Sequence, residues 1–361
     1  MKTYSKTILT AAFMLCFSAS GLAADLMEGF KLTGDFRYRH EYFDQKGLDE
    51  FNRHQVRARL NLQAKVTTGV NFIIQAATGE NDAPFSTDQT LNGSFSTKSL
   101  WLDQVYVNWQ PKNMDGLVVS AGKMPNPLRR VGDNQLMWNP EVFPEGLSAQ
   151  FASSNEGPRF FASASSFWME QRAQGENSYL IATQGGIDYL GSEFGLVAGL
   201  GYVGFTNAKG NVPYYNLGGF GNTLDAAGAY ANDFNIVEAF AQISTRNISI
   251  PIAVYADFAL NNGANTANQA YLIGFSLGKN DKPMTWAFNY NYIQIERDAL
   301  IGVLNDPDFA GGATDVKGSK MNLALRLTDK TTTDLTAILS DMSIDNGGKY
   351  NRIQWAFNFV F

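Results

Sequence analysis

Cysteine, histidine and long apolar runs are all scarce in this chain of 361 residues. Its single cysteine is Cys16, and its two histidines are His40 and His54. One cysteine cannot form an intrachain disulfide or a cysteine-based metal site. After Asp25, no apolar stretch approaches the roughly eighteen residues that indicate a membrane-spanning helix. These absences exclude a disulfide-stapled fold and a helical membrane protein.

Charge is also sparse, since only 17% of the residues are Asp, Glu, Lys or Arg and the formal net charge is −6. A mildly acidic chain is not built to hold nucleic acid over its whole surface. The basic residues that do occur near the start are therefore a local feature. We expect no nucleic-acid partner.

The first 24 residues have the composition of an export signal. Lys2 and Lys6 precede an apolar run from Ile8 to Phe17, and small residues end the segment at Ala24. This order of a basic start, a short apolar run and small residues is typical of a cleaved signal peptide. We predict that residues 1–24 are removed, which takes away two lysines and leaves a net charge of −8. Residues 25–361 are then expected to form a single domain.

Strand periodicity is clearest from Phe30 to Val66, where apolar and charged residues alternate in two runs separated by a polar break. Alternation with a period of two puts one kind of side chain on each face of a strand. Taken alone, these runs also fit an amphipathic hairpin of a soluble β protein. Their length suits tilted strands that cross a membrane, which need about nine to eleven residues.

The same alternation continues to the end of the chain, and short turns alternate with longer polar segments. Outer-membrane barrels have this arrangement, with short periplasmic turns and long outer loops. A closed barrel also leaves no backbone group unpaired in lipid. We therefore predict an all-β, transmembrane antiparallel β-barrel of about 16 strands, two of them within 30–66 and the others at 70–78, 100–110, 117–124, 146–153, 159–169, 178–190, 196–206, 234–244, 250–260, 268–278, 284–296, 319–328, 332–342 and 350–361.

Two of these strands have a less regular pattern. The segment 196–206 is apolar on both faces apart from its glycines, and 234–244 fits either register around Glu238 and Gln242. The last strand is regular. It carries an aromatic-rich face and ends the chain on Phe361, and a barrel can pair such a terminal strand with the first one, whereas free chain ends normally fray.

The assembled motifs resemble the Gram-negative porins, most closely the putative porin family. They are 34–39 (GDFRYR), 57–60 (RARL), 103–109 (DQVYVNW), 122–127 (GKMPNP), 138–139 (WN), 144–146 (PEG) and the terminal Phe361. The resemblance covers the mature chain and is sharpest before Phe151. It implies a barrel that assembles as a homotrimer in the outer membrane of a Gram-negative bacterium, in contact with membrane lipid. It also implies that the third outer loop folds into the lumen and that the barrel-insertion machinery recognises Phe361.

If the apolar faces meet lipid, the charged faces line water. The expected pore-lining residues on the first two strands are Lys31, Arg37, Arg39, Arg53, Arg57, Arg59 and Lys65. The candidate inward loop, 125–145, carries Arg129, Arg130, Asp133, Glu141 and Glu145. An acidic loop opposite a basic wall would set a transverse field across a constriction. Alternatively, the arginines pair with Asp35, Glu41 and neighbouring lumen groups and keep the wall rigid, and both roles are compatible.

We therefore predict a porin that lets small hydrophilic solutes and ions diffuse passively, with no catalytic residue, metal site or cofactor. One alternative is a barrel enzyme of the lipase or protease type, which would normally use a histidine held beside a serine. Neither His40 nor His54 has a serine close to it in sequence, and both are expected at the rim. A second alternative is a structural or adhesive barrel with a plugged lumen, but barrels of about sixteen strands typically leave an aqueous channel.

Overall fold

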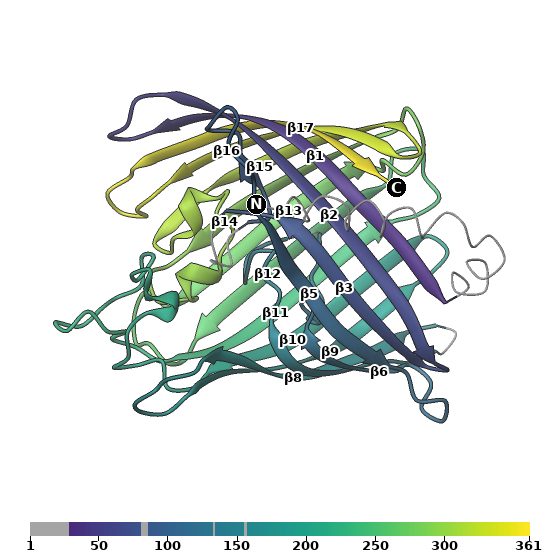
Figure 1. The fold of residues 1–361 in the computed structure, drawn as a ribbon, viewed down its shortest axis with the longest axis horizontal. Coiled ribbons are helices and arrows are strands. Elements are labelled where there is room, and N and C mark those ends of the chain that lie inside the picture. Colours follow the sequence, from purple (N-terminus) through teal and green to yellow (C-terminus); the bar gives the residue numbers. More distant parts are fainter. Residues whose placement is uncertain (1–28, 81–85, 133, 155–156) are drawn as a thin grey trace, which may run out of the picture.

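The fold is described by a computed structural model, which covers residues 29–80, 86–132, 134–154 and 157–361. The predicted signal peptide lies outside these residues. Nearly all regular structure is β (Figure 1). The strands are β1 (Phe30–Gln45), β2 (Phe51–Thr67), β3 (Val70–Thr78), β4 (Gln89–Thr90), β5 (Leu100–Trp109), β6 (Leu117–Lys123), β7 (Glu145–Ala152), β8 (Arg159–Glu170), β9 (Ser178–Leu190), β10 (Phe194–Phe205), β11 (Phe234–Thr245), β12 (Ile252–Asn261), β13 (Gln269–Gly278), β14 (Trp286–Ile295), β15 (Val316–Thr328), β16 (Thr331–Asp341) and β17 (Lys349–Val360). Three short 3-10 helices are η1 (Tyr214–Asn216), η2 (Gly302–Leu304) and η3 (Ala310–Gly312).

The strands form one closed antiparallel sheet. Consecutive wall strands pair with each other, and β1 pairs with both β2 and β17. At this seam the backbone of Phe361 exchanges two hydrogen bonds with Gly34, of 3.1 and 3.0 Å. The two-residue β4 only extends the wall beside the outer half of β2, through Gln55 and Val56. The prediction of a sixteen-stranded antiparallel barrel is therefore confirmed.

Long and short connections lie at opposite ends of the barrel. In Figure 1 the long connections gather at the left, whereas the short turns and the C-terminus lie at the right. We name four long connections L2 (79–99, which contains β4), L3 (124–144), L5 (206–233) and L7 (296–315). No described helix is long and apolar enough to cross a membrane.

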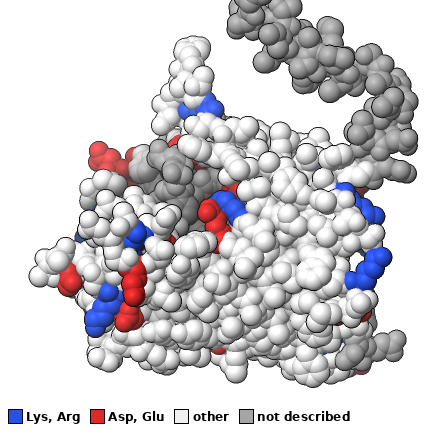
Figure 2. Space-filling model, turned by 60° about the horizontal axis from the view of Figure 1, so that its bottom comes forward, with Lys and Arg blue, Asp and Glu red and all other residues white. Residues whose placement is uncertain are grey.

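The outer face of the wall is apolar. Figure 2 shows one side of the barrel, where charged side chains lie mostly toward the two ends and a broad uncharged band separates them. Leu32, Leu60, Leu200 and Trp355 are among the large side chains exposed on this face. A lipid-facing wall has this composition, because hydrocarbon cannot solvate a charged group.

A second apolar region lies inside the barrel, against strands β8 to β14. Lumen-facing side chains such as Leu180, Phe234 and Leu272 pack there with apolar residues of L3 and L7, including Trp138 and Leu300. This internal core explains the irregular patterns of β10 and β11, because the outer faces of these strands are apolar and their inner faces pack against the apolar inward loops. Their sequences therefore lose the clean alternation of a strand with one wet face.

Candidate functional site

The basic residues of β1 and β2 form two adjacent rows on the inner wall. Alternate residues of each strand share this face, and the register sets Arg37 opposite Arg57 and Glu41 opposite Arg53. Rows of like charge would repel each other in the lumen. The arrangement therefore requires acidic partners, and some are carried by the same strands.

Two carboxylates of β1 neutralise part of these rows. Asp35 bonds Arg57 at 2.9 Å and Arg59 at 2.7 Å. Glu41 is fully buried and contacts Arg39 at 3.0 Å and Arg352 of β17 at 2.7 Å. Glu41 also accepts a hydrogen bond from Arg53, so it joins three arginines from three strands across the barrel seam.

The remaining partners come from three loops. Asp88 of L2 lies 2.6 Å from Arg37 and 2.6 Å from Arg39. Glu141 of L3 lies 2.8 Å from Arg57, and Asp308 of L7 lies 3.1 Å from Arg39 and 2.9 Å from Arg352. We call the whole set the charge cluster; it consists of Asp35, Arg37, Arg39, Glu41, Arg53, Arg57, Arg59, Asp88, Glu141, Asp308 and Arg352.

Two loop carboxylates of the charge cluster, Glu141 and Asp308, are held in their ionised form. Burial alone would raise the pKa of Glu141, but the guanidinium groups of Arg37 and Arg57 and the backbone N–H of Thr87 lower it to about 2. Burial acts in the same direction on Asp308, yet Arg352 and Arg39 hold its pKa well below its ordinary value. Both loops are therefore tethered by charge at neutral pH.

The ion pairs of Glu141 predict that L3 is released from the basic rows when the pH falls to about 2. A glutamate that is released from the cluster titrates near pH 4.3, so the ion pair stabilises the docked loop above that value and loses its effect as the pH falls to about 2. We expect current noise that depends on Glu141 to rise between about pH 3 and 2, as L3 is released. Bilayer recordings against pH check this, and Glu141→Gln should show the noisy state already at pH 7. A rise between pH 3 and 2 that is the same in Glu141→Gln would contradict the assignment.

L3 runs across the lumen between opposite walls. Its backbone bonds Gln184 of β9 and Gln242 of β11 through the N–H groups of Arg129 and Gly132, and its other end reaches β2 through Glu141. Gly132 has φ of +59°, and any side chain there would collide with the ring of Tyr255. Glycine thus lets L3 lie directly on β12.

The other residues expected in the constriction are distributed along L3 and beyond it. Arg129 pairs with Asp188 of β9 at 3.0 Å, and the Arg130 side chain reaches the backbone carbonyl of Asn134. Glu145 begins β7, is 61% exposed and pairs with Lys123 at 3.0 Å. Asp133 lies outside the described residues. Among the described members of this group, the structure brings only Glu141 to the basic rows.

Two of the residues expected to line the pore lie apart from the charge cluster. Lys31 and Lys65 are exposed near the turn end of β1 and β2. They take part in no ion pair within the described part of the chain. They make the wall at that end locally basic.

L5 holds L7 in place. Asn222 donates to the carbonyl groups of Arg297 and Leu300, at 2.8 and 2.7 Å. Thr223 donates to Asp298 through both its backbone N–H and its hydroxyl. L7 is also linked to L3, since Asn139 donates its N–H to the carbonyl of Leu304. The inward loops thus form one connected body.

Three cavities meet at one ion pair of the charge cluster. Volumes of about 340, 290 and 280 Å³ lie in succession from the loop end toward the middle of the barrel, and Arg39 and Asp308 line all three. The first also contacts Tyr350, the second Glu141 and the third Asn322. We call this succession of cavities the polar route; the Arg39–Asp308 pair lies where the three cavities meet.

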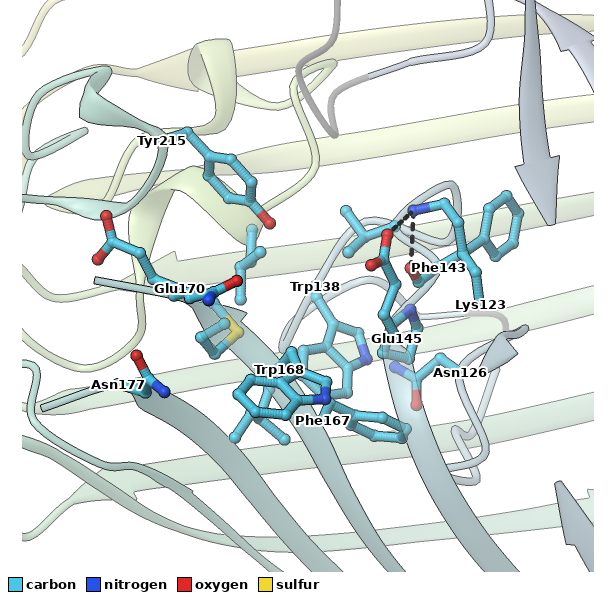
Figure 3. Close-up of a pocket in the computed structure, with 16 residues that line it drawn as sticks. Lys123, Asn126, Trp138, Phe143, Glu145, Phe167, Trp168, Glu170, Asn177 and Tyr215 are labelled. Carbon is cyan, nitrogen blue, oxygen red and sulfur yellow. Dashed lines mark hydrogen bonds and ion pairs between the residues drawn. The ribbon is translucent and has the colours of Figure 1, made fainter. Parts of the chain in front are cut away.

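A separate cavity of about 520 Å³ opens at the rim, between L3 and strands β7 to β9. Figure 3 shows Trp138, Phe167 and Trp168 together, with Lys123 and Glu145 on one side and Tyr215 and Glu170 on the other. It shares no lining residue with the three cavities of the polar route. The rim cavity is therefore a side recess of the wall.

The two histidines face away from the lumen. They are paired across β1 and β2 with ring centroids 4.6 Å apart, and the hydroxyl of Tyr38 lies 2.7 Å from Nδ1 of His54. Their parity is that of the outward, apolar face of these strands. In the described residues no group of three or more His, Cys, Asp or Glu side chains is arranged to hold a metal ion.

Three members of the charge cluster, Arg352, Asp88 and Asp308, were not predicted from the sequence. The sequence pattern could have identified only the first of them. Arg352 shares the polar face of the last strand with Gln354, so closing the barrel onto β1 would have predicted its contact with Glu41. Asp88 and Asp308 lie in long loops without periodicity. Nothing local distinguishes them from other loop aspartates, because their partners are far away in sequence.

Comparison with known proteins agrees with this geometry. The sequence matches the family described as "Putative porin" over residues 44–217 and 223–353. A search of curated proteins found no match. Solved structures with the same fold include OprB of Pseudomonas putida at high pH, which is 13% identical with a TM-score of 0.63 and coverage of 94% of this chain and 96% of that chain.

Two further structures share the fold. OmpF of Salmonella typhi in complex with daunomycin is 11% identical, with a TM-score of 0.59 and coverage of 92% of this chain and 97% of that chain. A loop L8 deletion mutant of OmpT, an outer membrane protein of Vibrio cholerae, is 11% identical, with a TM-score of 0.53 and coverage of 92% and 100%. The chain belongs to the putative porin family, and it is a porin of the outer membrane.

Proposed function

We propose that L2, L3 and L7 together form the constriction of this porin, and that small hydrophilic solutes and ions diffuse through the polar route beside it. The observation that carries the proposal is the charge cluster, in which one acidic residue from each of these loops bonds the basic rows. A loop fixed by several buried ion pairs keeps its position in the lumen. The constriction therefore has a defined shape without help from a ligand.

In this constriction the arginines and the loop carboxylates are in direct contact. Ion pairs at 2.6 to 3.1 Å cancel much of each other's field at longer range, because a contacting pair acts on distant ions as a dipole. We therefore assign the arginines mainly to holding the loops and only locally to a transverse field. The basic rows then give no strong preference for anions.

We further propose that transport involves no covalent step. A lipase- or protease-type site would need a base beside a nucleophile, and both histidines lie on the outward face, with their rings in contact with each other. A structural or adhesive barrel would have a blocked lumen, whereas the three successive cavities here follow one side of it. These observations support a passive channel.

The remaining parts of the proposal concern assembly. We propose that residues 1–24 are removed on export, leaving 25–361 as one barrel domain, and that three copies associate. Phe361 is proposed as the residue that the insertion machinery recognises, and its backbone pairs with Gly34 at the seam. Chemical crosslinking of the protein in native membranes tests the trimer, and a pattern that ends at the dimer would exclude it.

Osmotic swelling tests the channel itself. Liposomes that contain the folded chain 25–361 should swell in isotonic solutions of small sugars, at a rate that falls steeply as the solute grows. Liposomes with heat-unfolded protein serve as the control. Swelling that does not depend on solute size would indicate a bilayer defect, and the absence of swelling would contradict the proposed function.

A further inference from the structure

The two sides of the lumen differ in what fills them. Against β8 to β14 the space is occupied by the internal apolar core, where Ala182, Phe240 and Leu272 are almost completely buried. Water and ions have no path through such a packed region, because close-packed apolar side chains exclude them. Any route must therefore lie on the opposite side, along the polar part of β14 and along β15 to β17 and β1.

A polar cavity of about 280 Å³ lies on that side. Its lining consists of amide and hydroxyl groups from the wall together with residues of L3, L7 and β1; among them are Asn289, Asn291, Asn322, Asp334, Thr336 and Gln354. Side-chain amides carry both donors and acceptors and are electrically neutral. This part of the wall can hydrate a passing solute without selecting its charge.

Each basic group at this cavity is already in contact with a carboxylate. Arg37 and Arg39 are bonded within the charge cluster, and Nζ of Lys320 lies 2.8 Å from Asp306 and 2.7 Å from Oε1 of Gln135. Each cation thus has a carboxylate in contact. This contact weakens their attraction for anions.

Asp334 is the exception among the carboxylates that line the cavity. Asp308 is bonded to two arginines, but Asp334 accepts one hydrogen bond, from Nδ2 of Asn358 at 2.7 Å, and takes part in no ion pair among the described residues. The register places Ala356 between Asp334 and Arg39. A small side chain there leaves the carboxylate open to the cavity.

We propose that the conducting route runs on this side only, between L3 and L7 and the wall of β14 to β17, and that Asp334 gives it a preference for cations. Arg37, Arg39 and Arg57 act on Asp334 from beyond ion-pair distance, but no described cation contacts it. Such a carboxylate in a narrow channel with low-dielectric walls concentrates cations. The solutes favoured are then small cations and molecules with an ammonium group, followed by neutral hydroxylated solutes. This proposal rests on the proposed channel function and specifies its substrate class.

Reversal potentials of two matched variants test the proposal. Asp334→Asn should lower the cation-to-anion permeability ratio at least twofold in a KCl gradient. Asp103→Asn is the control, since Asp103 on β5 also bonds an amide, Gln75 at 2.7 Å, but β5 is separated from β16 by four wall strands and Asp103 does not line this cavity. It should leave the ratio unchanged. An effect of Asp103→Asn without an effect of Asp334→Asn would place the route on the other side and overturn the proposal.

Thiol modification gives a second readout that does not depend on charge selectivity. The chain 25–361 contains no cysteine, so a single one can be introduced. Thr336→Cys, in the cavity wall, should react with a cationic methanethiosulfonate reagent and lose at least half of its current. Ala182→Cys, buried in the apolar core, should not respond. The reverse pattern would refute the one-sided route.

These outcomes separate the two proposals. If the wild-type barrel is folded and does not conduct, the channel function fails and the route fails with it. If the barrel conducts, but Asp334→Asn does not change the permeability ratio and modification of Thr336→Cys does not change the current, only the proposed route is overturned.

Discussion

Replacing Glu41 with glutamine is expected to lower the free energy of unfolding by about 3–5 kcal/mol, the usual cost of removing one partner from a buried ion pair. Glu41 is fully buried and touches Arg39, Arg53 and Arg352. A neutral amide of the same shape would leave three guanidinium groups short of one negative charge at the barrel seam. Urea-induced unfolding of the refolded protein in phospholipid bilayers measures the change.

Asp44→Asn is the matched control for this prediction. Asp44 lies on the same strand and pairs with Lys349 at 2.6 Å, but the lysine is 54% exposed. Exposed ion pairs contribute about 1 kcal/mol or less. Equal losses for the two variants would show that the buried cluster has no special part in stability.

Replacing Trp138 with alanine is expected to raise the conductance and its fluctuations. Trp138 is 4% exposed and packs in the internal apolar core. Loss of a buried tryptophan side chain typically costs about 3–5 kcal/mol, which here falls on the docking of L3 against the wall. L3 should therefore leave its position more often and widen the route. Single-channel recordings compare the mean current and its noise.

Trp168→Ala makes the same chemical change at a different place. Trp168 lines the same rim cavity as Trp138 (Figure 3), but it is 54% exposed and lies on β8 of the wall. Its removal should leave the current of the open channel unchanged. If both variants conducted alike, L3 would not be held by the apolar core.

The wall of the barrel could be predicted from the sequence because its physical rule is local. Alternation in 30–66 separates lipid-facing from lumen-facing residues, and the order of turns and loops gives the antiparallel topology. The rule weakens at β10 and β11. There Val203 and Phe234 face the lumen yet are buried against the inward loops, so both faces of these strands are apolar.

The charge cluster could be predicted only in part. Periodicity puts Arg37, Arg39 and Arg57 on one face, but it does not tell which loops supply their partners. Asp88 and Asp308 contact Arg39 but lie far from it in the sequence, so no local pattern predicts these contacts. The contact also depends on how L5, L3 and L7 pack together, which is a property of the whole fold.

The most direct test of the account is the single-channel conductance of the folded chain 25–361 in a planar bilayer, recorded with a KCl gradient. We expect stable current steps at neutral pH and a reversal potential on the cation side, because each arginine at the constriction contacts a carboxylate whereas no described cation contacts Asp334. A folded protein that passes no current, or one whose reversal potential shows strong anion selectivity, would contradict it.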